Sequence, residues 1–470
     1  MEDFRKIAAE ITADVAAGRL LPGDRLLPQR TFAYERGIAA STAGRVYGEL
    51  VQRGIVVGEV GRGTYVRSPS SSLSPALAVP STAPVDMETN YPILRDQHRL
   101  LAPALHVLAS RADALDASMA APHVQANLSA RTTVTALLGS AGNWHPEPDS
   151  ILFAGNGRQA LAAAFSALAP VGTRVGFEAL TYPVASAIAG QLGIVAVPLA
   201  MDDEGLRPDA IETTHRDAPL NAVYVQPTVH NPLGTTMSAT RRADIAEVLE
   251  RLNGPVAIED RVYAFLEDTA PPPLAALAPD HCVVVDSLSK RVSPGLTLGF
   301  LAAPEHLLPK ITEALISGAW MAQGFALDMG VRWISDGTVE TLEVAKRRDA
   351  QARQLLALDA LSGLNIQANP VSYHLMLDLP APWRADAFVR AAALHGIAIS
   401  PASAFTVTPG HAPNAVRLAL APPTLDELTI SLKQLADIAR SNPTMTEPTC
   451  AGSTGLANKQ MRSPLAGISG

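Results

Sequence analysis

Two hydrophobic periods alternate through the central part of the chain. Short apolar runs predict buried strands, and the stretches between several of them carry apolar residues at helical spacing. The predicted strands are Ile151–Ala154, Arg174–Phe177, Ile194–Pro198, Ala222–Gln226, Val256–Glu259 and Cys282–Asp286. The predicted helices are Leu161–Leu168, Ala185–Leu192 and Arg241–Leu252. This alternation indicates an α/β domain with a mainly parallel sheet covered by helices on both faces.

The pattern changes after about Val371. A strand-like YHLMLDL at residues 373–379, a helix through Phe388–His395 and a second strand at Ile397–Ser400 follow one another closely. We therefore expect a smaller C-terminal α+β lobe beside the main sheet.

Residues 1–67 carry a separate pattern of three short helices and a hairpin. In the first helix, Phe4, Ile7, Ala8, Ile11 and Val15 fall at helical spacing and give one buried face. A second helix is predicted from near residue 28 and a third from about residue 41 to residue 53. Strands at 55–57 and 64–66 then flank a glycine-rich tip at 58–63. This order predicts a winged helix-turn-helix.

Two segments lack any hydrophobic period. Residues 68–87 are rich in Ser, Pro and Ala and carry no charge before Asp86, which predicts a linker. From Ser441 the chain is small, polar and aperiodic, so we expect residues 441–470 to be a disordered tail. The predicted domains are thus a head at 1–67 and a body at 88–440.

Composition narrows the class of protein. Of 470 residues, 47% are hydrophobic and 17% are charged, which excludes a chain that is disordered throughout. No run of about 18 uninterrupted apolar residues predicts a membrane span, and the charged N-terminus is unlike a secretory signal. Two cysteines, Cys282 and Cys450, exclude a disulfide framework and a cysteine zinc site, so we expect a reducing cytoplasm.

Charge separates the head from the rest. The net charge of −8 argues against nucleic acid as a partner of the whole chain. Residues 1–67, however, hold ten Lys and Arg against eight Asp and Glu, a net of +2, whereas the remainder holds 27 against 37, a net of −10. The two parts have opposite electrostatic character.

The predicted head has the parts that read DNA. Its third helix has the length that fits a major groove, with Arg45 on the exposed side. Arg62 lies between two glycines at the wing tip, where it can approach a phosphate closely. Further DNA-contact candidates are Arg30, Ser41 and Thr42. The alternative is a small interaction module that does not bind DNA.

A lysine loop is the strongest chemical signal in the body. Ser287-Leu288-Ser289-Lys290-Arg291 directly follows the apolar run CVVVD, and a Pro294-Gly295 turn comes next. A lysine at a strand end, among hydroxyls, suits a covalent bond to an aldehyde, because such an amine must lose its proton readily. A lone lysine there is usually a solvated surface residue, so the assignment depends on the motifs around it.

Two other strand ends carry groups that complement such a lysine. Asn156-Gly157-Arg158 follows the run ILFA and opens an Ala-rich helix, where backbone N–H groups can hold a phosphate. Alone, a Gly-rich turn between a strand and a helix is more often only a turn. Asp260 ends another predicted strand, and a carboxylate there can keep a pyridine nitrogen protonated while Tyr263 reaches a phenolic oxygen.

Three further positions each have a structural alternative. Tyr182 can stack on a ring or pack in the core. Asn231 can bond a ring hydroxyl or form a turn with Pro232. Arg417 lies inside an apolar strand and needs an anion, which a substrate carboxylate or a structural salt bridge would supply.

The head resembles a known family of repressors. The stretch AAGRLLPGDRLLPQR…GIAASTAGRVYGELVQRGIV…GRGTYV is similar to the GntR-type winged helix over nearly all of residues 4–67. The family usually has Ser-Arg where this chain has Ala39-Ala40, so its usual helix cap and one common DNA-contacting Arg are missing. Ser41 is a substitute cap.

Over about residues 88–438, the order and spacing of the body motifs resemble those of the fold-type I aminotransferases. These enzymes use pyridoxal 5′-phosphate. The resemblance implies that Lys290 forms the internal aldimine, that Asp260 pairs with the pyridine nitrogen and that Tyr182 stacks on the ring. It assigns Asn231 and Tyr263 to the 3-oxygen and Arg417 to an α-carboxylate. The implied phosphate cup is Asn156, Gly157, Arg158, Ser287 and Ser289. The family normally has Arg where this chain has Thr297, and Arg158 or Arg291 is the candidate for the missing charge.

Head and body together resemble the MocR/GabR group of transcriptional regulators. The resemblance implies that an amino-acid-like effector forms an external aldimine at Lys290 and that the changed body repositions the heads on promoter DNA. It also implies a homodimer in which each head packs against the other subunit's body. The rival interpretation is an active class I/II aminotransferase with an accessory winged helix, and a third is a binding module without cofactor.

Overall fold

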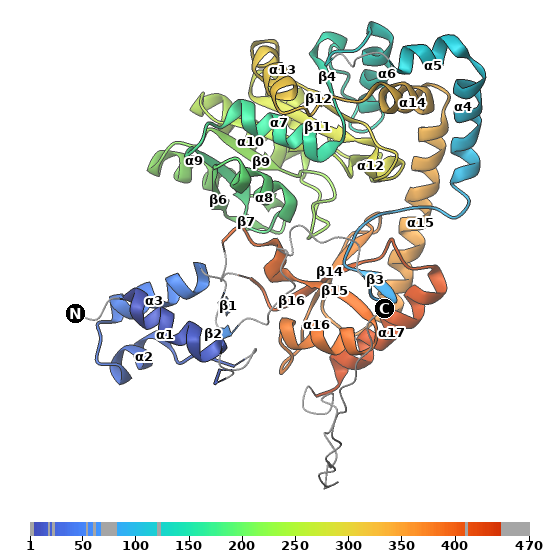
Figure 1. Cartoon of the computed structure of the whole chain (residues 1–470). Helices are drawn as coiled ribbons and strands as arrows, with labels where there is room; N and C mark the ends of the chain where they lie inside the picture. The colour runs from blue at the N-terminus through green and yellow to red at the C-terminus, as the bar shows by residue number, and fades with distance from the viewer. Residues whose placement is uncertain are drawn as a thin grey trace, which may run out of the picture.

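The computed structural model describes residues 4–16, 19–20, 24–52, 55–59, 63–66, 82–119, 124–408 and 412–442. Figure 1 shows three parts, which are a head, a large domain built on a seven-stranded sheet, and a small lobe built on a five-stranded sheet. The order of these parts follows the order of the hydrophobic patterns along the chain.

The head is the predicted winged helix. Its elements are α1 (Phe4–Ala16), α2 (Gln29–Glu35), α3 (Ala40–Gln52), β1 (Val56–Glu59) and β2 (Gly63–Val66). The two strands form an antiparallel pair. Apolar residues of α1 and α3, with Val56 and Val66 of the hairpin, bury one another in a core of their own. The head therefore has its own hydrophobic core, as the separate pattern in the sequence predicts.

The large domain has a seven-stranded sheet. In spatial order its strands are β4 (Ile151–Ala154), β12 (Gly299–Ala302), β11 (Cys282–Ser287), β10 (Val256–Asp260), β9 (Ala222–Val225), β5 (Arg174–Glu178) and β6 (Val195–Leu199). Pairing is parallel from β11 to β6, and β12 is antiparallel to both of its neighbours. The six predicted strands are confirmed to within one residue at each end. The short β12 was not predicted.

Helices bury both faces of this sheet because successive strand residues point to opposite sides. Leu152 packs in one core with α7 (Gly157–Leu168), α8 (Pro183–Gln191) and α13 (Leu308–Ser317). Its neighbour Phe153 packs in the other core, which holds residues of several more helices. Among them are α4 (His98–Ser110), α6 (Leu128–Gly139), α9 (Pro208–Asp217), α10 (Ala239–Leu252) and α14 (Gly324–Ser335).

The small lobe has a five-stranded sheet whose spatial order is β13 (Ile366–Ala368), β14 (His374–Asp378), β16 (Ala415–Ala419), β15 (Ile397–Pro401) and β3 (Val85–Met87). Helices α16 (Ala385–Leu394) and α17 (Leu425–Arg440) cover it. The long helix α15 (Thr338–Ala360) runs from the large domain to this lobe (Figure 1).

Strand β3 corrects the predicted linker. We predicted residues 68–87 as linker, but Val85–Met87 pairs in parallel with β15 and Met87 is fully buried. A three-residue strand with a central Asp is too short for a period to appear in the sequence, and its pairing partner lies about 310 residues further along the chain. Residues 67–81 and 443–470, and with them most of the predicted linker and tail, lie outside the described residues.

Among the helices described, none combines the length and the apolar character that crossing a lipid bilayer requires.

Candidate functional site

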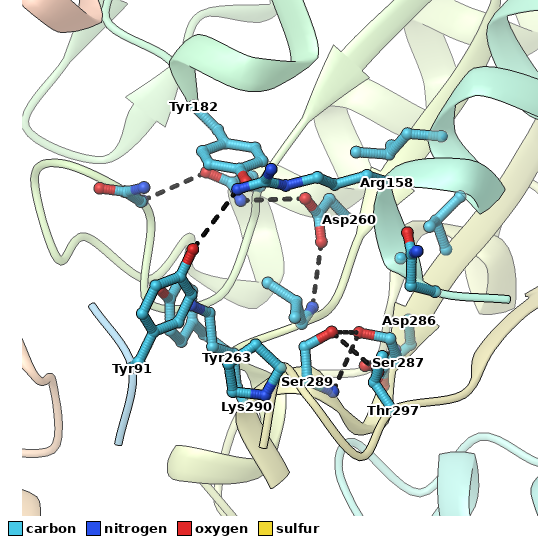
Figure 2. Close-up of a pocket in the computed structure, with 18 residues that line it drawn as sticks. Tyr91, Arg158, Tyr182, Asp260, Tyr263, Asp286, Ser287, Ser289, Lys290 and Thr297 are labelled. Atoms are coloured by element: carbon cyan, nitrogen blue, oxygen red, sulfur yellow. Dashed lines mark hydrogen bonds between the residues drawn. The ribbon is translucent and has the colours of Figure 1, made fainter. Parts of the chain in front are cut away.

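A cavity of about 240 Å³ lies where the parallel strands of the large sheet end (Figure 2). Carboxyl ends of parallel strands meet at one edge of a sheet, so the residues that follow β4, β9, β10 and β11 come together there. Ten of the eleven residues that we predicted to bind a cofactor line it, and Arg291 does not. The ten are Asn156, Gly157, Arg158, Tyr182, Asn231, Asp260, Tyr263, Ser287, Ser289 and Lys290.

Lys290 lies on α12 (Leu288–Arg291), a single helical turn that directly follows β11. Its Nζ donates a hydrogen bond to the carbonyl oxygen of Asn90 at 2.5 Å and lies 4.4 Å from the ring centroid of Tyr91. Burial, together with the nearby charges of Arg417 and Arg158, lowers the pKa of Lys290 to about 7. The amine is therefore largely neutral and nucleophilic just above neutral pH.

This lowered pKa predicts how chemical labelling of Lys290 depends on pH in the protein freed of cofactor. An amine with a pKa of about 7 is about one-tenth neutral at pH 6 and about nine-tenths neutral at pH 8. Only the neutral amine reacts, so labelling of Lys290 by acetic anhydride should rise roughly tenfold between these pH values and then level off. Peptide mass spectrometry, with Nα-acetyl-lysine as internal standard, measures the extent of labelling at each pH. Labelling that rises in parallel with the standard up to pH 10 would contradict the prediction.

Asp260 is a buried carboxylate at the end of β10. Its Oδ2 accepts hydrogen bonds from the Tyr224 hydroxyl at 2.7 Å and from the Gln226 side chain at 3.2 Å, and its Oδ1 accepts one from the Val262 N–H at 3.1 Å. Burial raises the pKa of Asp260 to about 6 despite these hydrogen bonds. A protonated ring nitrogen placed in the cavity would favour the ionised carboxylate.

Three hydroxyl groups form a chain beside Lys290. The oxygens of Ser287 and Ser289 are 2.8 Å apart, and those of Ser289 and Thr297 are 3.0 Å apart (Figure 2). The start of α7 faces them, capped by the side chain of Asn156. A Cβ on Gly157 would lie 2.9 Å from the Ser287 oxygen, so only glycine permits this close approach. Hydroxyls opposite a helix N-terminus form a suitable place for a phosphate.

Arg158 reaches across the mouth of the cavity. Its Nη2 donates to the Tyr91 hydroxyl at 3.5 Å, and the hydroxyl of Tyr182 is the largest influence that raises the pKa of Arg158 (Figure 2). Tyr182 immediately precedes α8, and its own pKa is raised by burial. Of the described residues that line this cavity, Arg158 and Lys290 carry the positive charges.

Arg291, the second candidate for a phosphate cation, is not part of the cavity. Its guanidinium is 1% exposed and forms ion pairs with Asp286, at 2.7 Å, and with Glu343. Consecutive residues of a helix point about 100° apart, so a turn that directs Lys290 into the cavity directs Arg291 away from it. A buried guanidinium needs carboxylates, and these two hold it in place.

Helix α15 holds the backbone of Lys290 and of the residues that follow it. The buried Lys346 donates from Nζ to the carbonyl oxygens of Lys290, at 2.7 Å, and Val292, at 2.8 Å. Burial lowers the pKa of Lys346 to about 7. Glu343, one turn earlier on α15, holds Arg291. No motif in the sequence indicated this support, because α15 lies about 50 residues after the lysine loop.

A second, smaller cavity of about 80 Å³ adjoins the first and shares Lys290 with it. Arg417 of β16 lies there, 5% exposed, and its Nη1 donates to the Asn231 side chain at 3.3 Å. Tyr263 lines both cavities, accepts a hydrogen bond from the Asn90 side chain at 3.0 Å and has a pKa raised by burial. The guanidinium of Arg417 is thus placed to bind an anion beside Lys290.

The head presents most of its predicted DNA-contact residues to solvent. Arg30 at the start of α2 is exposed, as are Ser41 and Arg45 on α3, while Thr42 is half-buried. The guanidinium of Arg45 lies 4.0 Å from the ring centroid of Phe4. Arg62 lies outside the described residues.

Tyr91 and Gln226 are among the lining residues of the main cavity that the sequence analysis did not identify as part of a site. Tyr91 follows β3, which we had assigned to the linker, so its position at a strand end was hidden. Gln226 directly follows β9, donates to Asp260 and accepts from the Asn231 N–H at 3.3 Å. Its place at the end of a predicted parallel strand was the signal that would have found it.

The cavity fits pyridoxal 5′-phosphate. Its donor set consists of a nucleophilic amine, a buried carboxylate supported by three hydrogen bonds, and hydroxyls opposite the N-terminus of α7. The close approach at Gly157 opens the cradle that a phosphate requires. Its volume is several times the ~30 Å³ that one water molecule occupies in the liquid.

Comparison with known proteins supports the predicted assignment of both the head and the body. A family model described as "Aminotransferase class I and II" matches residues 85–435, and one described as "Bacterial regulatory proteins, gntR family" matches residues 4–66. The chain is 28% identical over 427 residues to the uncharacterized HTH-type transcriptional regulator YdeF of Bacillus subtilis, covering 90% of this chain and 92% of that protein.

Two further similar proteins support the same assignment of head and body. The HTH-type pyridoxine biosynthesis transcriptional regulator PdxR of Corynebacterium glutamicum is 25% identical over 414 residues, which cover 85% of this chain and 87% of PdxR. In fold, the chain is similar to kynurenine aminotransferase of Pyrococcus horikoshii, with a TM-score of 0.69, 20% identity, and coverage of 76% of this chain and 91% of the enzyme. The chain belongs to the aminotransferase class I and II family, whose cofactor is pyridoxal 5′-phosphate, and with its gntR-family head it has the domain organisation of MocR-type transcriptional regulators.

Proposed function

We propose that the protein binds promoter DNA through its head and senses an amino compound at Lys290. The observation that carries this proposal is the lysine cavity on the same chain as a winged helix with exposed arginines. When bound, pyridoxal phosphate supplies an aldehyde that forms a covalent bond with a primary amine. The amines of Lys290 and of a small molecule therefore compete for one carbon atom.

We assign the cavity residues as follows. Asp260 would hold the proton on the ring nitrogen, and Asn231 and Tyr263 would bond the phenolic oxygen. Tyr182 would cover one face of the ring, and Arg417 would hold the carboxylate of the effector. Ser287, Ser289, Asn156, Gly157 and Arg158 would hold the phosphate, with Thr297 completing the row of hydroxyls.

Proton transfers follow from the pKa values of these groups. The amine of Lys290, with its pKa of about 7, accepts a proton once an effector has displaced it and returns the proton when the effector leaves. The raised pKa of Tyr263 keeps its hydroxyl protonated, so it donates a hydrogen bond to an anionic oxygen. Lys346 and Glu343 keep the loop of Lys290 in place during the exchange.

The head is expected to lose most of its DNA affinity when Arg30 and Arg45 are both replaced by alanine. Each arginine contact to a base or a phosphate contributes about 1–3 kcal/mol, so the double variant should bind on the order of 100-fold more weakly. Fluorescence anisotropy with the protein's own promoter fragment at moderate salt measures the affinity.

A matched control separates site-specific contact from overall charge. Replacing Arg207 and Arg216, two exposed arginines of the large domain, removes the same charge from the body. This control should bind promoter DNA within about twofold of the wild type. Equal losses in both double variants, or a wild type that binds random DNA as tightly as its promoter, would contradict the proposal.

We further propose a homodimer. Exposed apolar side chains occur on the neighbouring helices α4, α5 (Ala112–Ser118) and α14, and directly after α5, where Met119 is 70% exposed. The others are Leu100, Leu105, Val107, Leu115 and Phe325. Exposed apolar surface of this kind is typical of an interface, and a second copy would cover part of it. Sedimentation equilibrium that finds only monomer at micromolar concentration would contradict it.

For the domain bounds we propose residues 1–67 for the head and a body that begins at β3 and ends at residue 440.

A DNA-binding regulator of the bacterial type acts on the chromosome, and we therefore place the protein in the cytoplasm.

The alternative function is an active aminotransferase with an accessory head. It is favoured by the complete set of groups around Lys290, because Asp260, Tyr263 and Arg417 are all retained. Steady release of a keto acid from an amino acid, with a second keto acid as acceptor, would support the enzyme. A DNA affinity that an amine changes without such turnover would support the sensor.

A further inference from the structure

We infer that Glu88 makes the effector cavity selective for dibasic amino acids, which carry a second cationic group besides the α-amino and α-carboxylate groups. This inference deepens the proposed function and rests on it. Glu88 lines the same 80 Å³ cavity as Lys290 and Arg417, and no sequence motif pointed to it.

The loop that carries Glu88 is fixed by its own hydrogen bonds. Asp86 of β3 accepts at Oδ1 the backbone N–H of Glu88, at 2.8 Å, and that of Thr89, at 2.9 Å. Its Oδ2 accepts the hydroxyl of Thr89 at 2.5 Å. The parallel pairing of β3 with β15 anchors the same segment to the small lobe. Glu88 is thus held at the cavity wall before any ligand arrives.

The carboxylate of Glu88 forms no hydrogen bond and no ion pair within the described part of the chain. Arg417 donates to the backbone carbonyl of Glu88, and no ion pair within 4.0 Å joins the two side chains there. Burial, together with the charge of Asp86, raises the pKa of Glu88, while the charge of Arg417 lowers it. A half-buried carboxylate without a partner is unfavourable, and a ligand cation would relieve that cost.

The charges of the cavity indicate which ligand satisfies this group. The charged side chains that line it among the described residues are Glu88, Arg158, Lys290 and Arg417. In the proposed function, Arg417 takes the α-carboxylate, Lys290 gives way to the α-amine and Arg158 is assigned to the phosphate. Glu88 then remains as the one unbalanced acid. A side-chain ammonium or guanidinium pairs with it, an aliphatic side chain leaves it unpaired, and a second carboxylate is repelled.

Titration of the cofactor-loaded protein tests the inference, with the visible absorbance as readout. Ornithine and norvaline have the same number of carbon atoms and differ in the terminal ammonium, and glutamate has a carboxylate instead. We expect ornithine to half-saturate at a concentration at least tenfold below that of norvaline, with glutamate weakest. In Glu88→Gln the ratio of the ornithine and norvaline values should fall to within twofold of one, whereas Glu88→Asp, which keeps the charge, should retain a clear preference for ornithine.

The outcomes distinguish a failure of the selectivity at Glu88 from a failure of the proposed function. Equal half-saturation by ornithine and norvaline in the wild type overturns the inference, and so does a preference for ornithine that survives in Glu88→Gln. If no amino compound changes the absorbance, the proposed function itself fails. A Glu88→Gln protein that does not fold leaves the wild-type ratio and the Glu88→Asp ratio to decide.

Discussion

Replacing Lys290 with alanine is expected to abolish the response of DNA binding to amino compounds. The amine of Lys290 is the group that an effector must displace, and its pKa of about 7 suits it to that exchange. Without it, cofactor that enters the cavity has no protein amine to bond, so the visible absorbance of the lysine-linked form disappears as well. Anisotropy titrations of promoter DNA, with and without a saturating effector, measure the response, which we expect to fall from at least tenfold to none.

Lys310→Ala is the matched control for this prediction. Lys310 lies exposed on α13, so the substitution makes the same change of residue type without touching the cavity. Its response should equal that of the wild type. Circular dichroism of the Lys290→Ala protein should also match the wild type, because a half-buried lysine with a lowered pKa stabilises the fold little. An effector response that persists in Lys290→Ala would remove the covalent step from the proposal.

The sequence predicted the groups that lie directly after strands. Asn156, Asp260 and Ser287 come at the ends of β4, β10 and β11, and each strand was visible as an apolar run. Parallel strands bring such positions to one edge, so a local pattern was sufficient to assemble them in space. The winged helix was predictable for a similar reason, because its core is made of residues that are close in the chain.

What the sequence did not predict depends on long-range contacts. Lys346 holds the Lys290 carbonyl from 56 residues away, and Tyr91 reaches the cavity only because β3 joins a strand of the small lobe. Arg291 was misplaced because the direction of a side chain on a one-turn helix is set by its buried partners. Asp286 and Glu343 provide those partners, and only Asp286 is near in sequence.

Binding of the cofactor's phosphate group is expected to depend on Arg158 in this chain. Thr297 stands where the aminotransferases that the chain resembles carry an arginine, and its hydroxyl lies 3.0 Å from that of Ser289. Arg158 is then the guanidinium that lines the cavity, since Arg291 is held by two carboxylates. Charge-assisted hydrogen bonds contribute about 1.5–3 kcal/mol each. Arg158→Gln should therefore weaken the binding of pyridoxal phosphate on the order of 100-fold, measured by titration of the cofactor-free protein.

A second substitution tests whether Arg158 acts by placing a positive charge near the phosphate. Thr297→Arg restores a cation beside the hydroxyls of Ser287 and Ser289, so the double variant Arg158→Gln/Thr297→Arg should recover most of the lost affinity. Arg207→Gln, an exposed change distant from the cavity, should leave the affinity within twofold of the wild type. If Arg158→Gln binds the cofactor as tightly as the wild type does, the phosphate is neutralised without Arg158. The row of hydroxyls at the start of α7 would then be sufficient to hold it.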